Sequence, residues 1–162
     1  MIVFEHLLKA EVFGKYIKVN SGRNMEHLQN IIEYYDELYP VTEEQKKFYS
    51  RIQKSYPAPA RFLQIGCGTG ALEHALAKSG ADVTGIEVSK ELIEIAALRR
   101  RTQLMPIRFF QLSTLDMTRF LGKNFYNVIS CLNSRIVFVR DKTLVRKFFF
   151  DCKALLTEDG TL

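Results

Sequence analysis

One short stretch of the chain constrains its fold most: an apolar strand that runs into three alternating glycines and then into a helix. The apolar residues 62–65 predict the strand, and Gly66, Gly68 and Gly70 follow it directly. Glycine lets the backbone turn sharply, and it lets a ligand lie against the main chain where a Cβ atom would collide. The free N–H groups at the start of the next helix suit a carboxylate or a phosphate. The stretch therefore predicts a ligand-binding strand–loop–helix unit.

From residue 61 onward, short apolar runs alternate with helical segments. Strands are predicted over 62–65, 82–88, 107–112 and 126–132, and helices over 71–78, 90–101 and 141–156. This alternation with short connections implies right-handed crossovers and a parallel sheet that is covered on both faces. We therefore predict an α/β fold, a Rossmann-like parallel sheet with helices on both faces.

The first third of the chain reads as helices. Apolar residues at helical spacing predict one helix over 4–12 and another over 28–38, and Thr42 begins a third in capping-box style, with a glutamine three residues later. We expect residues 1–56 to form a helical extension or cap and residues 57–162 to form the ligand-binding domain.

The composition is that of an ordinary globular protein, with 47% hydrophobic and 25% charged residues in a chain of 162. A formal net charge of +5 permits an acidic partner without requiring one. Cys67, Cys131 and Cys152 form no CxxC pair and no cluster at metal-ligand spacing, which predicts a reducing, cytoplasmic compartment without a zinc site. No signal-peptide core and no apolar run of 18 residues is found, so no membrane segment is expected.

An acidic residue ends the second predicted strand. Glu87 lies 21 residues after Gly66, where a carboxylate can accept hydrogen bonds from both hydroxyls of a ribose. The glycines also satisfy the loose dinucleotide fingerprint, because Ala71 can stand for its last glycine. A nicotinamide-dependent oxidoreductase is therefore one alternative.

Three stretches together resemble the class I S-adenosylmethionine-dependent methyltransferases. They are Leu63-Gln-Ile-Gly-Cys-Gly-Thr-Gly70, Gly85-Ile-Glu-Val-Ser89 and Leu92-Ile-Glu-Ile-Ala96, and the usual family pattern is LDIGCGTG followed by G(I/V)(D/E)xS. The resemblance runs from about Tyr34 to Leu162. It implies S-adenosylmethionine as the cofactor and methyl transfer as the activity.

The resemblance also implies which residues bind the cofactor. The three glycines would line its methionine part, Glu87 would hold the ribose hydroxyls, and Val88 would pack on the adenine. A looser match over residues 107–117 places a serine where the family has the acid that meets the adenine. The implied cofactor-binding residues are Gln64, Gly66, Cys67, Gly68, Gly70, Glu87, Val88, Ser113 and Thr114.

At three positions the chain departs from the family pattern in the same sense. Gln64, Ser113 and Asn127 stand where the family has acids, and each change removes a negative charge that could face a cationic sulfonium. A second hypothesis follows, that the chain is a cofactor-binding or partner-binding module of this fold without catalysis.

The substrate side is expected beyond the fourth predicted strand, because ligands bind at the carboxyl ends of parallel strands. Asn133 is a candidate to orient a nucleophile or to cap the loop, and Cys131 is predicted to be a small buried residue. Tyr35 lies in a stretch similar to the YDxLY that precedes the domain in small-molecule methyltransferases, so it would reach the site or pack the helix. No unique catalytic residue is required, since alignment and desolvation are the main contributions a protein makes to this transfer.

The sequence argues against a nucleobase acceptor. It lacks the (D/N)PP(Y/F) and Pro-Cys signatures of base methyltransferases, and its basic clusters, at 99–101 and 135–147, are predicted to be solvated. The function we predict is methyl transfer from S-adenosylmethionine to a small molecule.

The end of the sequence predicts an incomplete sheet. Residues 156–162 resemble the LxPGG turn that introduces the fifth strand of the family's sheet, whose order is 3-2-1-4-5-7-6. We therefore expect the strand around Val128 to be an apolar edge that further residues, another chain or the N-terminal helices must cover.

Overall fold

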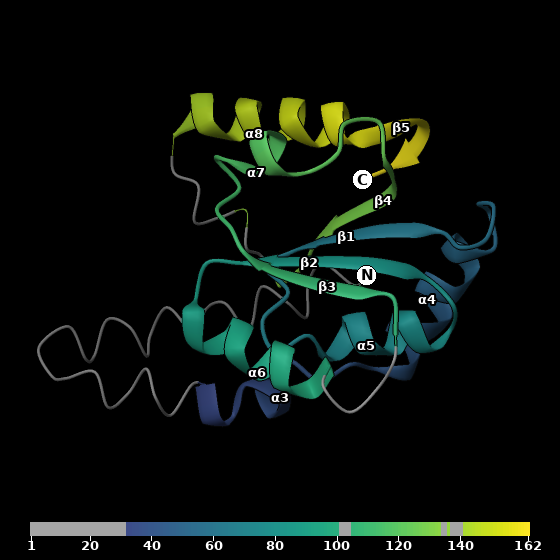
Figure 1. Ribbon diagram of the computed structural model, residues 1–162, viewed down its shortest axis with the longest axis vertical. Coiled ribbons are helices and arrows are strands. Elements are labelled where there is room, and N and C mark those ends of the chain that lie inside the picture. The colour runs from purple at the N-terminus through teal and green to yellow at the C-terminus, as the bar shows by residue number, and fades with distance from the viewer. Residues whose placement is uncertain (1–31, 101–104, 134–135, 137–140) are drawn as a thin grey trace, which may run out of the picture.

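The computed structural model describes residues 32–100, 105–133, 136 and 141–162, which form a five-stranded parallel sheet with helices on both faces (Figure 1). The strands, in spatial order β3-β2-β1-β4-β5, are β1 (Arg61–Ile65), β2 (Asp82–Glu87), β3 (Ile107–Gln111), β4 (Tyr126–Cys131) and β5 (Leu156–Thr161). The helices are α3 (Tyr35–Leu38), α4 (Glu43–Gln53), α5 (Ala71–Lys78), α6 (Lys90–Arg100), α7 (Met117–Phe120) and α8 (Lys142–Leu155). The predicted α/β fold is confirmed.

The sheet separates two hydrophobic cores because successive side chains of a strand point to opposite faces. In β1, Phe62 packs with α4 and α5, whereas Leu63 and Ile65 pack with α7 and α8 on the other face. Figure 1 shows α8 and α7 above the sheet and α5 and α6 below it. The alternation also directs Gln64 to the same face as Phe62, toward α4 and α5.

The elements predicted from residue 61 onward are found with small shifts at their ends, whereas the helix predicted over 28–38 is described only from residue 32 and is interrupted at Tyr34, before α3. The helix at 71–78 has the predicted limits, and α8 begins one residue after Asp141, whose carboxylate accepts hydrogen bonds from the N–H groups of Thr143 and Leu144. The helix predicted over 4–12 lies outside the described residues. The short helix α7 was not predicted, because its four residues are too few for a periodic pattern.

The expectation that the strand around Val128 lies at the sheet edge is wrong for this structure. Residues 156–161, which were predicted to be a turn, form β5 and pair in parallel with β4, with a register shift between Tyr126 and Val128. The hydroxyl of Tyr56, just after α4, donates to the carbonyl of Asp159 at 3.0 Å and lies 2.7 Å from Thr161 Oγ1. This pairing satisfies backbone groups of β4 that an open edge would leave exposed.

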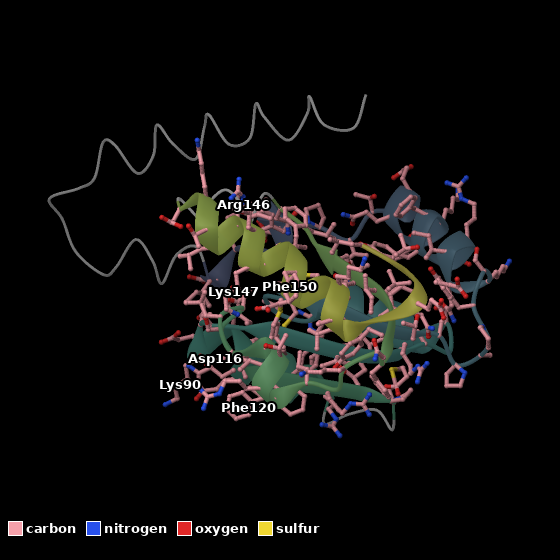
Figure 2. All side chains as sticks on the ribbon, turned by 90° about the horizontal axis from the view of Figure 1, so that it is seen from above. Lys90, Asp116, Phe120, Arg146, Lys147 and Phe150 are labelled. Atoms are coloured by element: carbon pink, nitrogen blue, oxygen red, sulfur yellow. The ribbon has the colours of Figure 1, made fainter. Side chains whose placement is uncertain are left out.

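The outer surface of α7 and α8 carries both aromatic and basic side chains. Figure 2 shows Phe120 and Phe150 on this surface, with Arg146 and Lys147 nearby. Phe148, two residues before Phe150, is buried against the sheet. α8 therefore contributes one face to the core, as an amphipathic helix does.

The capping box at the start of α4 gives a stability prediction. Thr42 Oγ1 accepts a hydrogen bond from Gln45 N at 3.2 Å, and Gln45 Oε1 accepts one from Thr42 N at 3.1 Å. We expect Thr42→Ala to lower the free energy of unfolding by about 1 kcal/mol, because the N–H group of Gln45 loses its side-chain acceptor at the start of the helix. Urea unfolding measures the effect. Ser55→Ala, at the other end of α4, is the matched control, and an equal loss in both variants would contradict the prediction.

Candidate functional site

The backbone of the glycine loop explains why glycine alternates there. Gly66, Gly68 and Gly70 have φ angles of +73°, +58° and +74°, which place all three in the left-handed region that other residues rarely adopt. The N–H groups of Gly66 and Cys67 both donate to the carbonyl of Ile86, at 2.8 and 3.1 Å. The loop is therefore fixed to the end of β2, and it leads directly into α5.

Glu87 joins the loops that follow β1 and β2. Its buried carboxylate accepts hydrogen bonds from Gly68 N at 3.2 Å, from Val88 N at 2.8 Å and from Ser89 N at 3.3 Å. A carboxylate has about four acceptor positions. Three are used within the chain, so the remaining capacity suits one ligand hydroxyl rather than the two that the sequence suggested.

A cavity of about 220 Å³ lies beside Glu87 on the α7–α8 side of the sheet. Four of the residues expected to bind the cofactor line it, namely Gly66, Glu87, Val88 and Thr114. The rest of its wall is largely apolar and includes Ile65, Ile86, Leu112 and Phe148. Such a chamber, apolar with a few polar groups at its rim, suits a flat heterocycle attached to a polar group.

One prediction about this region needs correction and another stays a prediction. The hydroxyl of Ser113 accepts a hydrogen bond from Leu115 N at 3.2 Å in the turn after β3, and its role in cofactor binding stays a prediction. Cys131 is half-buried and lines the cavity, whereas the sequence predicted a buried residue. The end of β4 therefore contributes a wall of the site rather than core packing.

A second, smaller cavity of about 50 Å³ opens on the α4–α5 side of the sheet. Five predicted site residues line it, which are Tyr35, Gln64, Gly66, Cys67 and Asn133. Ile65 and Gly66 line both cavities, so the two chambers meet at the first glycine of the loop. Asn133 has a φ of +55°, in agreement with a loop-capping position.

The floor of the smaller cavity is polar and buried. Gln64 and Glu73 are each 2% exposed, and Ser130 Oγ donates a hydrogen bond to Gln64 Oε1. Within the described part of the chain, Gln64 Nε2 and Glu73 Oε2 have no hydrogen-bond partner, and leaving such a buried atom unpaired costs about 1–3 kcal/mol. Burial raises the pKa of the Glu73 carboxyl to about 8.

The sequence analysis did not identify Glu73. An acid in the first turn of a helix is ordinarily explained by the helix dipole, so the sequence alone gives it no distinguishing signal. Only the folding of α5 beside the end of β1 places Glu73 in the wall of the same cavity as Gln64, nine positions earlier in the chain.

Helix α3 covers the glycine loop. Tyr35 is buried against Gly68, where any side chain would overlap its hydroxyl. Asp36 accepts a hydrogen bond from Thr69 Oγ1 and forms an ion pair with Arg99 on α6. Tyr35 therefore both packs the helix and reaches the site, and Arg99 is paired rather than simply solvated as predicted.

Asn127 lies away from the site. It is near the beginning of β4, and its Oδ1 accepts hydrogen bonds from Arg61 N at 2.9 Å and Arg61 Nε at 3.4 Å. The glycine loop is at the opposite end of the strands. The proposal that an acid at this position would face the ligand is therefore wrong, because side chains at the start of a parallel strand lie a full strand length from its carboxyl end.

Within the part of the chain that the structure describes, no three His, Cys, Asp or Glu side chains are placed to hold a metal ion. None of the helices in that part is long and apolar enough to cross a membrane.

The contacts of Asp36 predict how α3 is held. We expect Asp36→Asn to speed amide hydrogen exchange in residues 34–39, because the variant loses the ion pair with Arg99 and weakens the hydrogen bond with Thr69. Glu37→Gln is the matched control, and hydrogen exchange read by mass spectrometry is the measurement. Unchanged exchange in Asp36→Asn would show that α3 is held by Tyr35 packing alone.

Comparison with known proteins agrees with this geometry. The methyltransferase domain family matches residues 62–160. A protein of Geobacillus sp. (strain WCH70) that carries a provisional methyltransferase name is 34% identical over 102 residues, covering 63% of this chain and 40% of that protein. A ubiquinone biosynthesis O-methyltransferase of Actinobacillus pleuropneumoniae serotype 7 is 31% identical over 105 residues, covering 63% of this chain and 43% of that protein.

A solved structure shares the fold. The S-adenosylmethionine-dependent methyltransferase of Clostridium acetobutylicum ATCC 824 superposes with a TM-score of 0.66 at 19% identity, covering 83% of this chain and 55% of that one. The chain spans less than half the length of the curated relatives named above. The family match extends over most of the parallel sheet and includes both the glycine loop and Glu87. The chain therefore belongs to the class I S-adenosylmethionine-dependent methyltransferases.

Proposed function

We propose that this chain binds S-adenosylmethionine and forms the cofactor domain of an enzyme that methylates a small molecule. The observation that carries the proposal is the pair of cavities that meet at Gly66, beside the ends of β1, β2 and β4. One is wide and largely apolar, and the other is small and polar, as the nucleoside and amino-acid ends of this cofactor require.

The residues of the larger cavity suit the nucleoside end. The remaining acceptor position of Glu87 would take a ribose hydroxyl, and Val88, which is 64% exposed, would offer an apolar surface to the adenine. Thr114, which follows the position of the family's acid, lines the larger cavity and would offer its hydroxyl to the adenine. Ser113 would act through the turn that places Thr114.

The glycine loop would support the middle of the cofactor. Gly66 and Cys67 line the smaller cavity, whereas Gly68 and Gly70 would contribute through the backbone path rather than through contact with the ligand. When bound, the cofactor supplies an electrophilic methyl group on a sulfonium. The chain would contribute alignment and the exclusion of water, with Tyr35 and Asn133 on the side where the acceptor enters.

A small-molecule acceptor fits the charges better than a nucleic acid does. Several basic side chains are paired with carboxylates, among them Arg99 with Asp36 and Lys147 with Asp151, and the net charge is only +5. The relative named for ubiquinone biosynthesis transfers a methyl group to oxygen, by its name. We also propose a cytoplasmic location, on the absence of paired cysteines in the sequence.

A module that binds the cofactor without catalysis is the second candidate. The observation that favours it is Gln64 at the position of the family's strand acid. The two candidates differ in turnover, since both bind the cofactor but only an enzyme consumes it in the presence of an acceptor. The two candidates are separated by measuring the S-adenosylhomocysteine that forms from S-adenosylmethionine in the presence of a panel of phenols, amines and carboxylic acids.

Ligand-induced stabilisation tests the cofactor. We expect S-adenosylhomocysteine at about 100 times its Kd to raise the free energy of unfolding by about 2.7 kcal/mol, because it binds only the folded chain. NADH at the same concentration is the control and should leave the melting temperature unchanged. Stabilisation by NADH alone would instead support the oxidoreductase alternative.

Glu87 gives a second prediction. We expect Glu87→Gln to weaken binding of S-adenosylhomocysteine at least tenfold, because the amide loses a charge-assisted hydrogen bond to the ligand and turns an N–H group toward the donors of its own loop. Isothermal titration calorimetry measures the affinity, and circular dichroism checks the fold. Glu91→Gln, an exposed change in the first turn of α6, is the matched control. Equal affinities in both variants would refute the role of Glu87.

A further inference from the structure

The smaller cavity is lined by two side chains with buried polar atoms, one of which needs a hydrogen-bond acceptor and the other a donor. Gln64 Nε2 is a hydrogen-bond donor and Glu73 Oε2 is an oxygen of a carboxyl group, and neither atom has a hydrogen-bond partner among the residues that the structure describes. Both side chains line the same cavity, and each is 98% buried. Buried polar atoms in native proteins nearly always have partners, so two together on one wall point to a polar ligand group.

Gln64 and Glu73 together favour a ligand group that both accepts and donates hydrogen bonds. Gln64 Nε2 needs an acceptor, while an ionised Glu73 needs a donor. The head of an α-amino acid carries a carboxylate and an ammonium on one carbon atom. The carboxylate can accept a hydrogen bond from Gln64, and the ammonium can donate one to Glu73. The cavity of about 50 Å³ holds about three to five water-sized groups, which matches such a head.

The position of the cavity connects it to the cofactor. Gly66 and Ile65 line both chambers, so a ligand whose nucleoside lies in the larger one extends past the first glycine into the smaller one. This step rests on the proposed function. The end of S-adenosylmethionine opposite its nucleoside is an α-amino acid.

A carboxyl group that could bind the ammonium of this amino-acid end is present, but it does not lie on β1. Gln64 replaces the acid of the family's strand, and Glu73, in the first turn of α5, is a buried acid that lines the same cavity. We propose that Glu73 provides the carboxylate that binds the ammonium group of the cofactor, while the amide of Gln64 binds the cofactor's carboxylate. The negative charge of the site has thus moved from the strand to the helix.

The surroundings of Glu73 predict a proton change on binding. Burial raises the pKa of Glu73 to about 8, nearby Glu87 acts in the same direction, and Arg99 acts against both. The other titratable side chains that line this cavity are Tyr35, Tyr39 and Cys67. At pH 7 the carboxyl is therefore mostly protonated, and an ammonium placed beside it favours the charged form. Binding of the amino-acid end should release a proton.

The test compares two ligands that share the nucleoside. S-adenosylhomocysteine carries the amino-acid end and 5′-methylthioadenosine lacks it. We expect Glu73→Gln to weaken S-adenosylhomocysteine binding at least tenfold in calorimetry and to change 5′-methylthioadenosine binding less than twofold. Glu94→Gln, an exposed change on α6, is the matched control and should alter neither.

Two further measurements separate this role from a structural one. Titrations at pH 7 in buffers of different ionisation enthalpy should show nearly one proton released when S-adenosylhomocysteine binds the wild-type chain and none in Glu73→Gln. Adding Gln64→Glu to Glu73→Gln returns a carboxylate to the strand and should restore most of the affinity, which a merely unstable fold would not allow.

The outcomes are distinct. Equal weakening of both ligands in Glu73→Gln, or unchanged binding of S-adenosylhomocysteine, overturns the role of Glu73 while leaving the proposed function standing. Failure of the wild-type chain to bind either ligand overturns the proposed function and this inference together. Selective loss of the ligand with the amino-acid end, with rescue by the second substitution, supports the relocated charge.

Discussion

The carboxylate of Glu87 is the interaction on which the rest of the site depends. It accepts N–H groups from the glycine loop after β1 and from its own loop after β2, so one side chain sets the distance between the two. The carbonyl of Ile86 adds two hydrogen bonds from the same glycine loop. These hydrogen bonds add to the parallel pairing of β1 with β2 and fix the start of α5 relative to the rim of the larger cavity.

The alternation of side chains along β1 then divides the site into two chemical environments. Ile65 faces the apolar chamber under α8, and Gln64 faces the polar chamber beside α5. A ligand with an aromatic and a zwitterionic end is thereby oriented by the pleat of one strand. The helix α3 closes the polar side, since Tyr35 lies on Gly68 and Asp36 holds both the loop and α6.

The three residues that replace acids of the family pattern have different surroundings in the structure. Gln64 lines the same cavity as Glu73, a buried acid from the next helix, which can supply the charge that the strand lacks. Ser113 serves the turn that places Thr114. Asn127 fixes the starts of β1 and β4 to each other through Arg61. Three substitutions of one kind in the sequence thus have three separate roles in the folded chain.

The sequence by itself determined the order of strands and helices, the glycine positions and the strand-end acid, because each is a local property of period, backbone angle or spacing. Only the tertiary structure decided that Glu73 and Gln64 line one cavity, that Tyr35 covers Gly68 and that β5 pairs with β4. These contacts join segments that are distant in the sequence, and the local residue pattern of one segment does not indicate which other segment it will contact. Their formation depends on which faces become buried together, and that is settled by packing of the whole sheet.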